Sequence, residues 1–347
     1  MNADALAEQG FRFHRNVRNR GSQYEYALAA MSRAGELLTA NDARIRYKVR
    51  TLEEQAQQVD RFAVALKEYP NRWNEHTAIF SSEHILPWIH QEKWIKTLDE
   101  MFCEVFTEVR YIVYFRAQPD LVVSQYSERI KRGATVTLDQ FIDRRLKQAL
   151  NHFRPAKRWA NAVGMDRIDV RLMDPGFLKN GDLIEDFCGV CGIDPTPLSP
   201  TPRANPSLNA SAAECLRCLN VYIPEILPEG GYNPMRKGLL ADVMKRAEGG
   251  PKLRLLPEEK EKIDAKTAAS NEKLRQQFFP NRKALFTSES DTEGWQSRQA
   301  AKEQALDIVA QLFSECRAEK NVPSMSNEQV APSIFSQLVS RVKRTGT

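Results

Sequence analysis

The sequence lacks a long apolar run. Its longest apolar stretches fall far short of the roughly 20 residues that a membrane-spanning helix needs. Its first dozen residues are mixed polar and contain no apolar core segment, so they do not have the pattern of a secretory signal peptide. We therefore expect no transmembrane segment and a cytoplasmic location.

A strong excess of one charge is also absent. The 347 residues include 50 Lys and Arg and 45 Asp and Glu. The charged fraction of 27% and the hydrophobic fraction of 42% are ordinary for a soluble globular protein. We expect no nucleic-acid partner, although local basic patches would suit an anionic cofactor or an anionic glycan. The length is enough for one large α/β domain or two smaller ones.

Cysteine is sparse, and its spacing gives weak support for a metal site. Four of the six cysteines form two Cys-x-x-Cys pairs, Cys188 with Cys191 and Cys215 with Cys218, and 23 residues separate the pairs. This gap is slightly wider than in a usual zinc ribbon. Both pairs continue helical apolar patterns, where cysteine packs as a small hydrophobe. We expect buried free thiols and no metal, with structural zinc as the alternative, and no disulfides in a cytoplasmic protein.

The most informative stretch runs from residue 108 to residue 133. Val109–Phe115 is rich in Val, Ile, Tyr and Phe and too short for a typical helix, which predicts a buried strand. Arg116 follows at the strand's carboxyl end, and Pro119 suits the first turn of a helix that ends near Gly133. In open α/β sheets, ligands bind beyond the carboxyl ends of the strands. Arg116 has a planar fork suited to phosphate, and the Ser124 hydroxyl could face the same crevice.

This pattern resembles the bacterial branch of the sulfotransferase family, whose members use 3′-phosphoadenosine 5′-phosphosulfate (PAPS). The resemblance covers roughly residues 1 to 285. It implies that Arg116 and Ser124 bind the 3′-phosphate of the nucleotide. The alternative interpretation is a strand, turn and helix whose surface Arg pairs with an acidic neighbour. The matching motifs are Tyr114-x-Arg116, Gln118-x-Asp120, Ser124-x-Tyr126, Lys131-x-Gly133, Arg158-Trp159-Ala160 followed by Gly164, and the helical stretch from Gly181 to Ile193.

A second matching segment holds the candidate catalytic residues. Ile79 and Phe80 predict a short strand, and Ser81 to His84 follow at its carboxyl end, where the family shows a similar Ser-Ser-Glu. Sulfuryl transfer needs a base to take the proton of the acceptor hydroxyl. Glu83 is the first candidate and His84 the second. The alternatives are that Glu83 serves as a helix N-terminal carboxylate and that His84 is an ordinary packed or surface histidine.

The sequence departs from the family pattern at its start. Family members begin with a strand, a phosphate loop of the form Gly-x-x-Lys-x-Gly-Thr-Thr/Ser and a helix; here Leu6 and Gly10 match the region after that loop, and the printed sequence contains no Gly-rich phosphate loop. Either the working protein is longer, or this is a reduced relative that cannot hold the 5′-phosphosulfate. The family's loop strand lies inside the sheet, and its loss would leave backbone groups unpaired, which favours the first interpretation.

From these observations we predict an α/β fold. It would be a P-loop-type three-layer sandwich with a mostly parallel sheet and many helices, occupying residues 1–286, followed by a helical C-terminal extension over residues 287–347. Amphipathic patterns over residues 299–317 and 329–344 predict helices in the extension. We expect these helices to pack on the core or to mediate self-association.

The predicted activity is transfer of a sulfuryl group from PAPS to a hydroxyl of a carbohydrate or lipid-linked glycan. Two alternatives stay open. The chain is a non-catalytic relative that keeps the fold as a binding or assembly module, or it is a helical scaffold that binds anionic partners through scattered Arg and Lys side chains.

Overall fold

The computed structural model describes residues 2–14, 23, 25–38, 44, 48–148, 150–200, 207–227, 231–287 and 298–319. The chain divides into two compact units. Unit 1 comprises Met1–Gln118, Ala149–Pro202 and Asp264–Glu289. Unit 2 comprises Pro119–Gln148, Arg203–Ile263 and Ser290–Thr347. The predicted boundary between residues 286 and 287 stays a prediction.

Unit 1 contains two pairs of parallel strands. The first pair joins β1 (Phe11–Phe13) to β2 (Thr77–Ile79), and the second joins β3 (Tyr111–Phe115) to β4 (Ile168–Leu172). The predicted strands at residues 79–80 and 109–115 are confirmed as β2 and β3, with ends that differ by a few residues. The described chain is therefore a helix-rich α/β protein with short parallel strand pairs.

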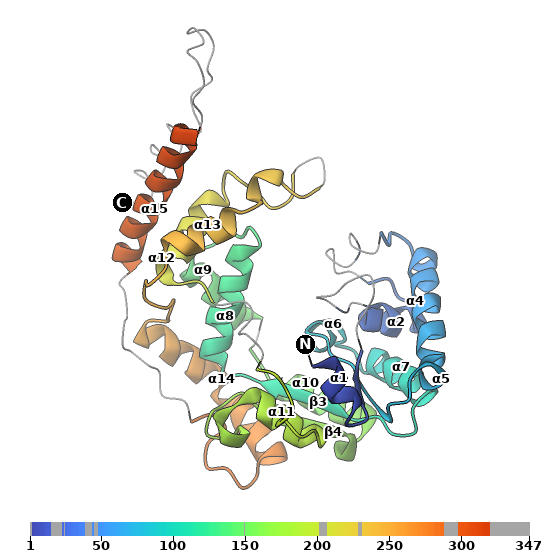
Figure 1. Ribbon diagram of the computed structural model, residues 1–347. Helices are drawn as coiled ribbons and strands as arrows, with labels where there is room; N and C mark the ends of the chain where they lie inside the picture. The colour runs from blue at the N-terminus through green and yellow to red at the C-terminus, as the bar shows by residue number, and fades with distance from the viewer. Residues whose placement is uncertain are drawn as a thin grey trace. The chain divides into compact units, whose positions relative to one another are not determined.

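Helices surround these strands in unit 1 (Figure 1). They are α1 (Ala3–Ala7), α2 (Glu25–Arg33), α4 (Leu52–Lys67), α5 (Tyr69–Arg72), α6 (Ile85–Trp88), α7 (Glu92–Cys103), α10 (Phe153–Val163) and α11 (Leu183–Cys191), together with most of α14 (Pro257–Phe278). In the part of the chain that the structure describes, no helix combines the length and the apolarity needed to cross a bilayer.

Local sequence signals set several helix ends. Thr51 caps α4 by accepting a hydrogen bond from the backbone N–H of Glu54, and the Glu54 carboxylate accepts from the Thr51 backbone N–H in return. Thr51 followed three residues later by Glu54 is the sequence pattern of a capping box, and the structure has this capping box. It satisfies backbone donors that would otherwise lack partners at the start of the helix.

Apolar residues at helical spacing from Pro87 to Phe106 predict a single helix, and this prediction is wrong. The structure has two helices there, α6 ending at Trp88 and α7 beginning at Glu92. Gln91 between them has an extended backbone, with φ −114° and ψ 142°. The Trp88 carbonyl accepts a hydrogen bond of 3.0 Å from the His90 side chain, which helps to close the break. Apolar residues keep a helical spacing across the break because side chains of both helices pack in the same core. The sequence pattern therefore does not show the break.

That core is the main hydrophobic cluster of unit 1. It collects one face of α7, including Trp94, Leu98 and Phe102, and the residues of β3 and β4 that point the same way, such as Phe115 and Leu172. Alternate residues of a strand face opposite sides. The remaining residues of β3 and β4 therefore face the other side, where α11 lies against Tyr114 and Arg171.

Unit 2 is helical. It contains nearly all of α8 (Gln118–Lys131), with α9 (Leu138–Lys147), α12 (Ala210–Leu219), α13 (Leu239–Arg246) and α15 (Arg298–Glu319). The hairpin between α8 and α9 turns at Gly133, whose φ is +86° and where an added Cβ would lie 3.1 Å from Cβ of Glu225. A residue with a side chain would be strained in this position.

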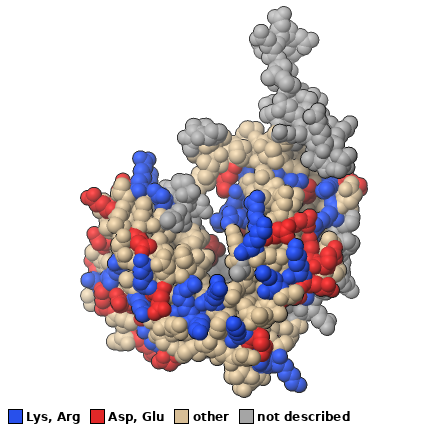
Figure 2. All heavy atoms as spheres, turned by 180° about the vertical axis from the view of Figure 1, so that it is seen from behind, with Lys and Arg blue, Asp and Glu red and all other residues tan. Residues whose placement is uncertain are grey.

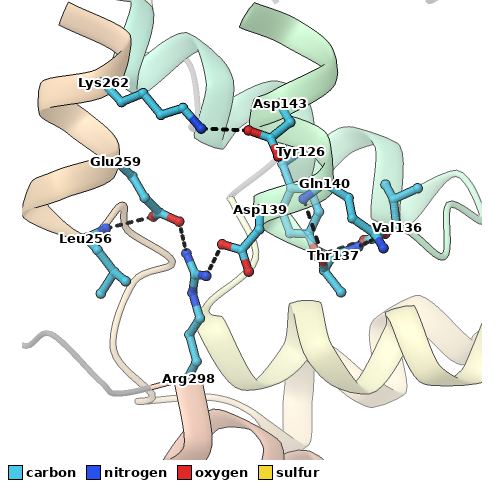
Figure 3. Close-up of polar contacts among 10 residues, drawn as sticks. All are labelled: Tyr126, Val136, Thr137, Asp139, Gln140, Asp143, Leu256, Glu259, Lys262 and Arg298. Atoms are coloured by element: carbon cyan, nitrogen blue, oxygen red, sulfur yellow. Dashed lines mark hydrogen bonds and ion pairs between the residues drawn. The ribbon is translucent and has the colours of Figure 1, made fainter. Parts of the chain in front are cut away.

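The predicted helix over residues 299–317 is confirmed as α15, which packs on α12. Its first residue, Arg298, forms ion pairs with Asp139 on α9 and Glu259 on α14 (Figure 3). We call these three residues the Arg298 clamp. Beside it, Lys262 pairs with Asp143 at 2.7 Å. The helix predicted over residues 329–344 lies outside the described residues.

Candidate functional site

Arg116 lies immediately after β3, in the turn that leads into α8. Its side chain is half-buried. Its backbone carbonyl accepts a hydrogen bond of 2.8 Å from Nε2 of His152, at the start of α10. The His152 ring also stacks on Phe115, with centroids 4.6 Å apart. The backbone from which the Arg116 guanidinium projects is therefore fixed by a residue on another element.

An amide pair, with Gln118 buried and Asn271 half-buried, holds the next part of the same turn. Nε2 of Gln118 donates to Oδ1 of Asn271 at 2.6 Å, and Nδ2 of Asn271 donates to Oε1 of Gln118 at 3.0 Å. Gln118 also donates to the carbonyl of Leu150. Reciprocal amide bonds fix the orientation of both groups. The turn between β3 and α8 is thus attached to α14 as well as to the segment before α10.

Burial keeps His152 uncharged. It lowers the pKa of His152 to about 4, against a smaller opposite effect from the hydrogen bond to Arg116. Because a carbonyl can only accept, Nε2 carries the proton in this bond. His152 therefore acts as a neutral donor that positions the Arg116 backbone, and it adds no positive charge beside the guanidinium.

Ser124 lies on α8 and is half-buried. It belongs to unit 2, whereas Arg116 belongs to unit 1. Joint binding of one phosphate by Arg116 and Ser124 therefore stays a prediction.

Glu83 and His84 follow β2, in the segment that leads into α6. Oε1 of Glu83 lies 3.3 Å from Nε2 of His84. The Glu83 side chain is 66% exposed, whereas that of His84 is 10% exposed. His84 stacks on Trp88 with ring centroids 4.3 Å apart. The structure thus brings the two predicted catalytic residues together as an accessible carboxylate beside a packed imidazole.

Ser82 fixes the backbone of this segment. Its hydroxyl donates to the carbonyl of Gln23 at 2.9 Å and accepts from the His84 backbone N–H at 3.2 Å. These bonds orient the chain just before α6. Glu83 itself projects into solvent, where it can accept a proton from a bound hydroxyl. An exposed carboxylate of this kind can also be an ordinary surface residue.

Sequence reasoning missed a buried polar network on the other face of β3 and β4. Asp186 of α11 accepts hydrogen bonds from Arg171 on β4, from the Tyr114 hydroxyl on β3 at 2.8 Å and from the Lys179 backbone N–H at 3.1 Å. Its side chain is only 2% exposed. Burial alone would raise the pKa of Asp186, but these hydrogen bonds outweigh it and hold the pKa below its ordinary value. In the sequence, the Asp-Phe pair at residues 186 and 187 indicated only a helix. It gave no sign that Asp186 takes part in this network.

The Cys-x-x-Cys pairs lie on helices, as the sequence predicts. Cys188 and Cys191 are on α11, Cys215 and Cys218 are on α12, and all four thiols are free. Cys188 and Cys215 are buried, and burial raises the pKa of Cys215 to about 12. Among the described residues, no three His, Cys, Asp or Glu side chains converge to hold a metal ion.

Figure 2 shows Lys and Arg side chains lying among Asp and Glu side chains on the face that it draws. A scaffold that binds anions through its surface would need a region of one sign. On the described residues of this face, side chains of both signs lie among one another.

Comparison with known proteins gives no independent support for any family. No family model matches the chain, no curated protein matches it, and no solved structure matches it. The resemblance to sulfotransferases therefore depends on the sequence motifs alone.

Proposed function

We propose that the chain is a sulfotransferase-like protein that transfers a sulfuryl group from PAPS to a hydroxyl of a carbohydrate or lipid-linked glycan. In this proposal Arg116 and Ser124 bind the 3′-phosphate, and Glu83 takes the proton of the acceptor hydroxyl with His84 beside it. The fold would be a P-loop-type three-layer sandwich. The acceptor oxygen forms the new bond to sulfur as the bond from sulfur to the nucleotide's phosphate oxygen breaks.

The observation that carries the proposal is the anchored turn after β3. Its backbone is held by His152 and by the amide pair of Gln118 with Asn271. An Arg on a fixed backbone loses less conformational freedom when it binds a planar oxyanion. The position of Arg116 after a parallel strand agrees with the general location of ligand sites in α/β proteins.

Calorimetric titration with 3′,5′-ADP tests the nucleotide half of this proposal. We expect saturable binding by the wild-type chain and weaker binding of 5′-AMP, which lacks the 3′-phosphate. Arg116→Gln should weaken 3′,5′-ADP binding about 10- to 100-fold, because a charge-assisted hydrogen bond contributes about 1.5–3 kcal/mol. The same substitution should leave 5′-AMP binding nearly unchanged.

Arg110→Gln is the matched control. Arg110 precedes the same strand at its other end and pairs with Asp169 at 2.8 Å on the surface. This variant should bind 3′,5′-ADP as the wild type does. If the folded wild-type chain binds neither nucleotide, or if Arg110→Gln weakens binding as much as Arg116→Gln, the assignment of the 3′-phosphate to Arg116 is wrong.

The second candidate is a non-catalytic relative that keeps the fold and acts as a binding or assembly module. The two candidates differ in turnover. A sulfotransferase should sulfate a glycan acceptor with labelled PAPS and lose most of this activity in Glu83→Gln. A binding module should hold the nucleotide or glycan without turnover.

A further inference from the structure

Between α12 and α13 in unit 2, a short hairpin and the turn after it carry the two most exposed large apolar residues of the described chain (Figure 1). Tyr232 is 70% exposed and Met235 is 65% exposed, and Ile226 on the same hairpin is 43% exposed. We call these three residues the Tyr232 patch. Single exposed apolar residues are common on protein surfaces, but a group of them marks an interaction site.

The backbone of the hairpin places two of these side chains on one face. Ile226 and Tyr232 lie opposite each other in an antiparallel bridge. Two backbone hydrogen bonds of 2.9 Å flank this pair, from the N–H of Leu227 to the Gly231 carbonyl and from the N–H of Asn233 to the Glu225 carbonyl. A pair flanked in this way is of the non-hydrogen-bonded kind, in which the two side chains are closest to each other. Ile226 and Tyr232 therefore present one continuous apolar surface.

The hairpin and the turn after it are fixed to the rest of unit 2. The Arg236 guanidinium donates three hydrogen bonds of 2.6–2.9 Å, to Oδ1 of Asn220 and to the carbonyls of Ile223 and Lys131. Asn233 is buried, and its side chain accepts a hydrogen bond of 3.0 Å from the Met235 N–H. The patch is thus presented on a backbone that is already ordered, so a partner that covers it has little backbone entropy to remove.

The exposure of the patch decides which kind of partner fits it. Because neighbouring atoms cover only about a third of Tyr232 and Met235, these side chains project from the surface and do not line a groove. The three residues together expose roughly 350 Å², if a fully exposed side chain of this size offers about 200 Å². A stable protein interface needs roughly 800 Å² on each partner. The patch is too small for such an interface, but projecting side chains can enter a soft apolar phase.

The charge beside the patch is positive. Lys237 follows Met235 by two residues and is exposed, and its side chain has no hydrogen bond or ion pair within the described part of the chain. Glu225 is the acidic residue on the described strands of the hairpin, and it is half-buried. Burial lowers the pKa of Arg236, and the nearby Glu225 carboxylate acts in the opposite direction. The charge of Glu225 is therefore offset by Arg236, whereas the charge of Lys237 is left for a partner.

We propose that the Tyr232 patch inserts into the headgroup region of an anionic phospholipid bilayer, with Lys237 at the level of the lipid phosphates. Tyr232 suits this place because its ring is apolar and its hydroxyl can stay hydrated. Ile226 and Met235 supply aliphatic surface that enters the boundary with the acyl chains, and anionic headgroups attract a nearby Lys. A contact of this size is peripheral and reversible, because its strength depends on the small apolar area and on the charge together.

Vesicle co-sedimentation tests this contact with the full chain and without any nucleotide, so its outcome is independent of the proposed sulfotransferase function. The probes are vesicles of phosphatidylcholine mixed with phosphatidylglycerol, and vesicles of pure phosphatidylcholine. The wild-type chain should bind the anionic vesicles more tightly than the neutral ones. Lys237→Gln should weaken binding to the anionic vesicles about fivefold, the effect of one Lys near an anionic surface, and should leave binding to the neutral ones unchanged.

A double substitution tests the apolar part of the contact. Tyr232→Ser combined with Met235→Ser should weaken binding to the anionic vesicles about 10- to 100-fold, because two side chains no longer leave water. Val64→Ser combined with Ile184→Ser is the matched control, since both residues are exposed apolar residues of unit 1. It should bind as the wild type does. All four positions are exposed, so each double variant should keep the wild-type circular dichroism spectrum.

Four results would overturn the proposal. The folded wild-type chain could fail to bind anionic vesicles, or it could bind them equally well after the substitutions at Tyr232 and Met235. The control variant could lose as much binding as the patch variant, which would show a general effect of apolar surface. Finally, sedimentation velocity without lipid could show a dimer that only the patch substitutions dissociate, with no vesicle binding, which would make the patch a contact between copies of the chain.

Discussion

Replacing Asp186 by Asn should destabilise unit 1 strongly. The Asp186 carboxylate accepts hydrogen bonds from Arg171, from the Tyr114 hydroxyl and from the Lys179 backbone N–H. An Asn has one oxygen that accepts and one amide nitrogen that donates. The amide nitrogen would face groups that are themselves donors, so Arg171 would lose its counter-charge and at least one donor would lose its acceptor.

The magnitude follows from burial. Removing one partner of a buried ion pair costs about 3–5 kcal/mol. The Asp186 side chain is 2% exposed, but that of Arg171 is 25% exposed, so water can solvate part of the guanidinium that remains. We therefore expect a loss of about 2–4 kcal/mol in the free energy of unfolding. Asp169→Asn is the matched control, because its pair with Arg110 is on the surface and should contribute only about 0–1 kcal/mol.

Urea unfolding monitored by tryptophan fluorescence measures this loss in the appropriate unit. Unit 1 contains four tryptophans, which are Trp73, Trp88, Trp94 and Trp159. A loss below about 1 kcal/mol for Asp186→Asn, or a loss equal to that of Asp169→Asn, would refute the reasoning.

The dependence on pH gives a second test of the same network. The folded state holds the pKa of Asp186 below its ordinary value of about 3.9. The carboxylate therefore stabilises the fold fully above pH ~4, and this contribution is lost as the pH falls toward the lower folded-state pKa. The difference between wild type and Asp186→Asn should be constant near pH 7 and should shrink in acid. A difference that stays constant through this acid range would show that the charge of Asp186 is not responsible.

Three further predictions concern other elements. Thr51→Ala should cost about 1 kcal/mol in the free energy of unfolding through loss of the α4 cap, and an unchanged urea midpoint would contradict this. His152 has a folded-state pKa of about 4, below its ordinary 6.5, so its contribution to stability should be complete above pH ~6.5 and decrease by on the order of 3 kcal/mol toward pH 4. His152→Phe should remove this part of the pH dependence in urea titrations, and an unchanged profile would argue against a buried neutral imidazole. Arg298→Met should break the Arg298 clamp and speed amide exchange in α15, whereas Lys262→Met, which breaks a well-exposed pair, should not. Equal exchange in the two variants would show that the clamp does not hold α15.

Local signals in the sequence predicted local structure well. The capping boxes at Thr51 and Thr137 mark the starts of α4 and α9, because side chain and backbone lie only three residues apart. The strand at β3 followed from its residue types. The pairing of strands could not be predicted in this way. Strands β1 and β2 are separated by more than 60 residues, and nothing in either segment specifies the other.

The candidate site shows the same limit. The sequence placed Arg116 after a strand, and the structure agrees. The groups that hold its turn come from far along the chain, with His152 36 residues away and Asn271 153 residues beyond its partner Gln118. A single sequence contains no signal that links such positions. Their roles follow only from packing, which brings α10 and α14 to the end of β3.

The acidic residues near the strands differ in whether their carboxylate oxygens already accept hydrogen bonds from the protein. This difference bears on which of them can accept a proton from a bound hydroxyl. Asp186 is occupied by Arg171, Tyr114 and a backbone N–H, and Asp174 after β4 is buried and accepts from Gly176 N and from Thr287. A carboxylate whose oxygens are already taken by donors is a poor proton acceptor, because protonation would break those bonds. Glu83 differs, since its side chain is 66% exposed and its Oε1 lies 3.3 Å from Nε2 of His84. Of these three carboxylates it alone keeps an oxygen accessible to an incoming hydroxyl, so a base in this region is better sought at Glu83 than at the more buried and better connected aspartates.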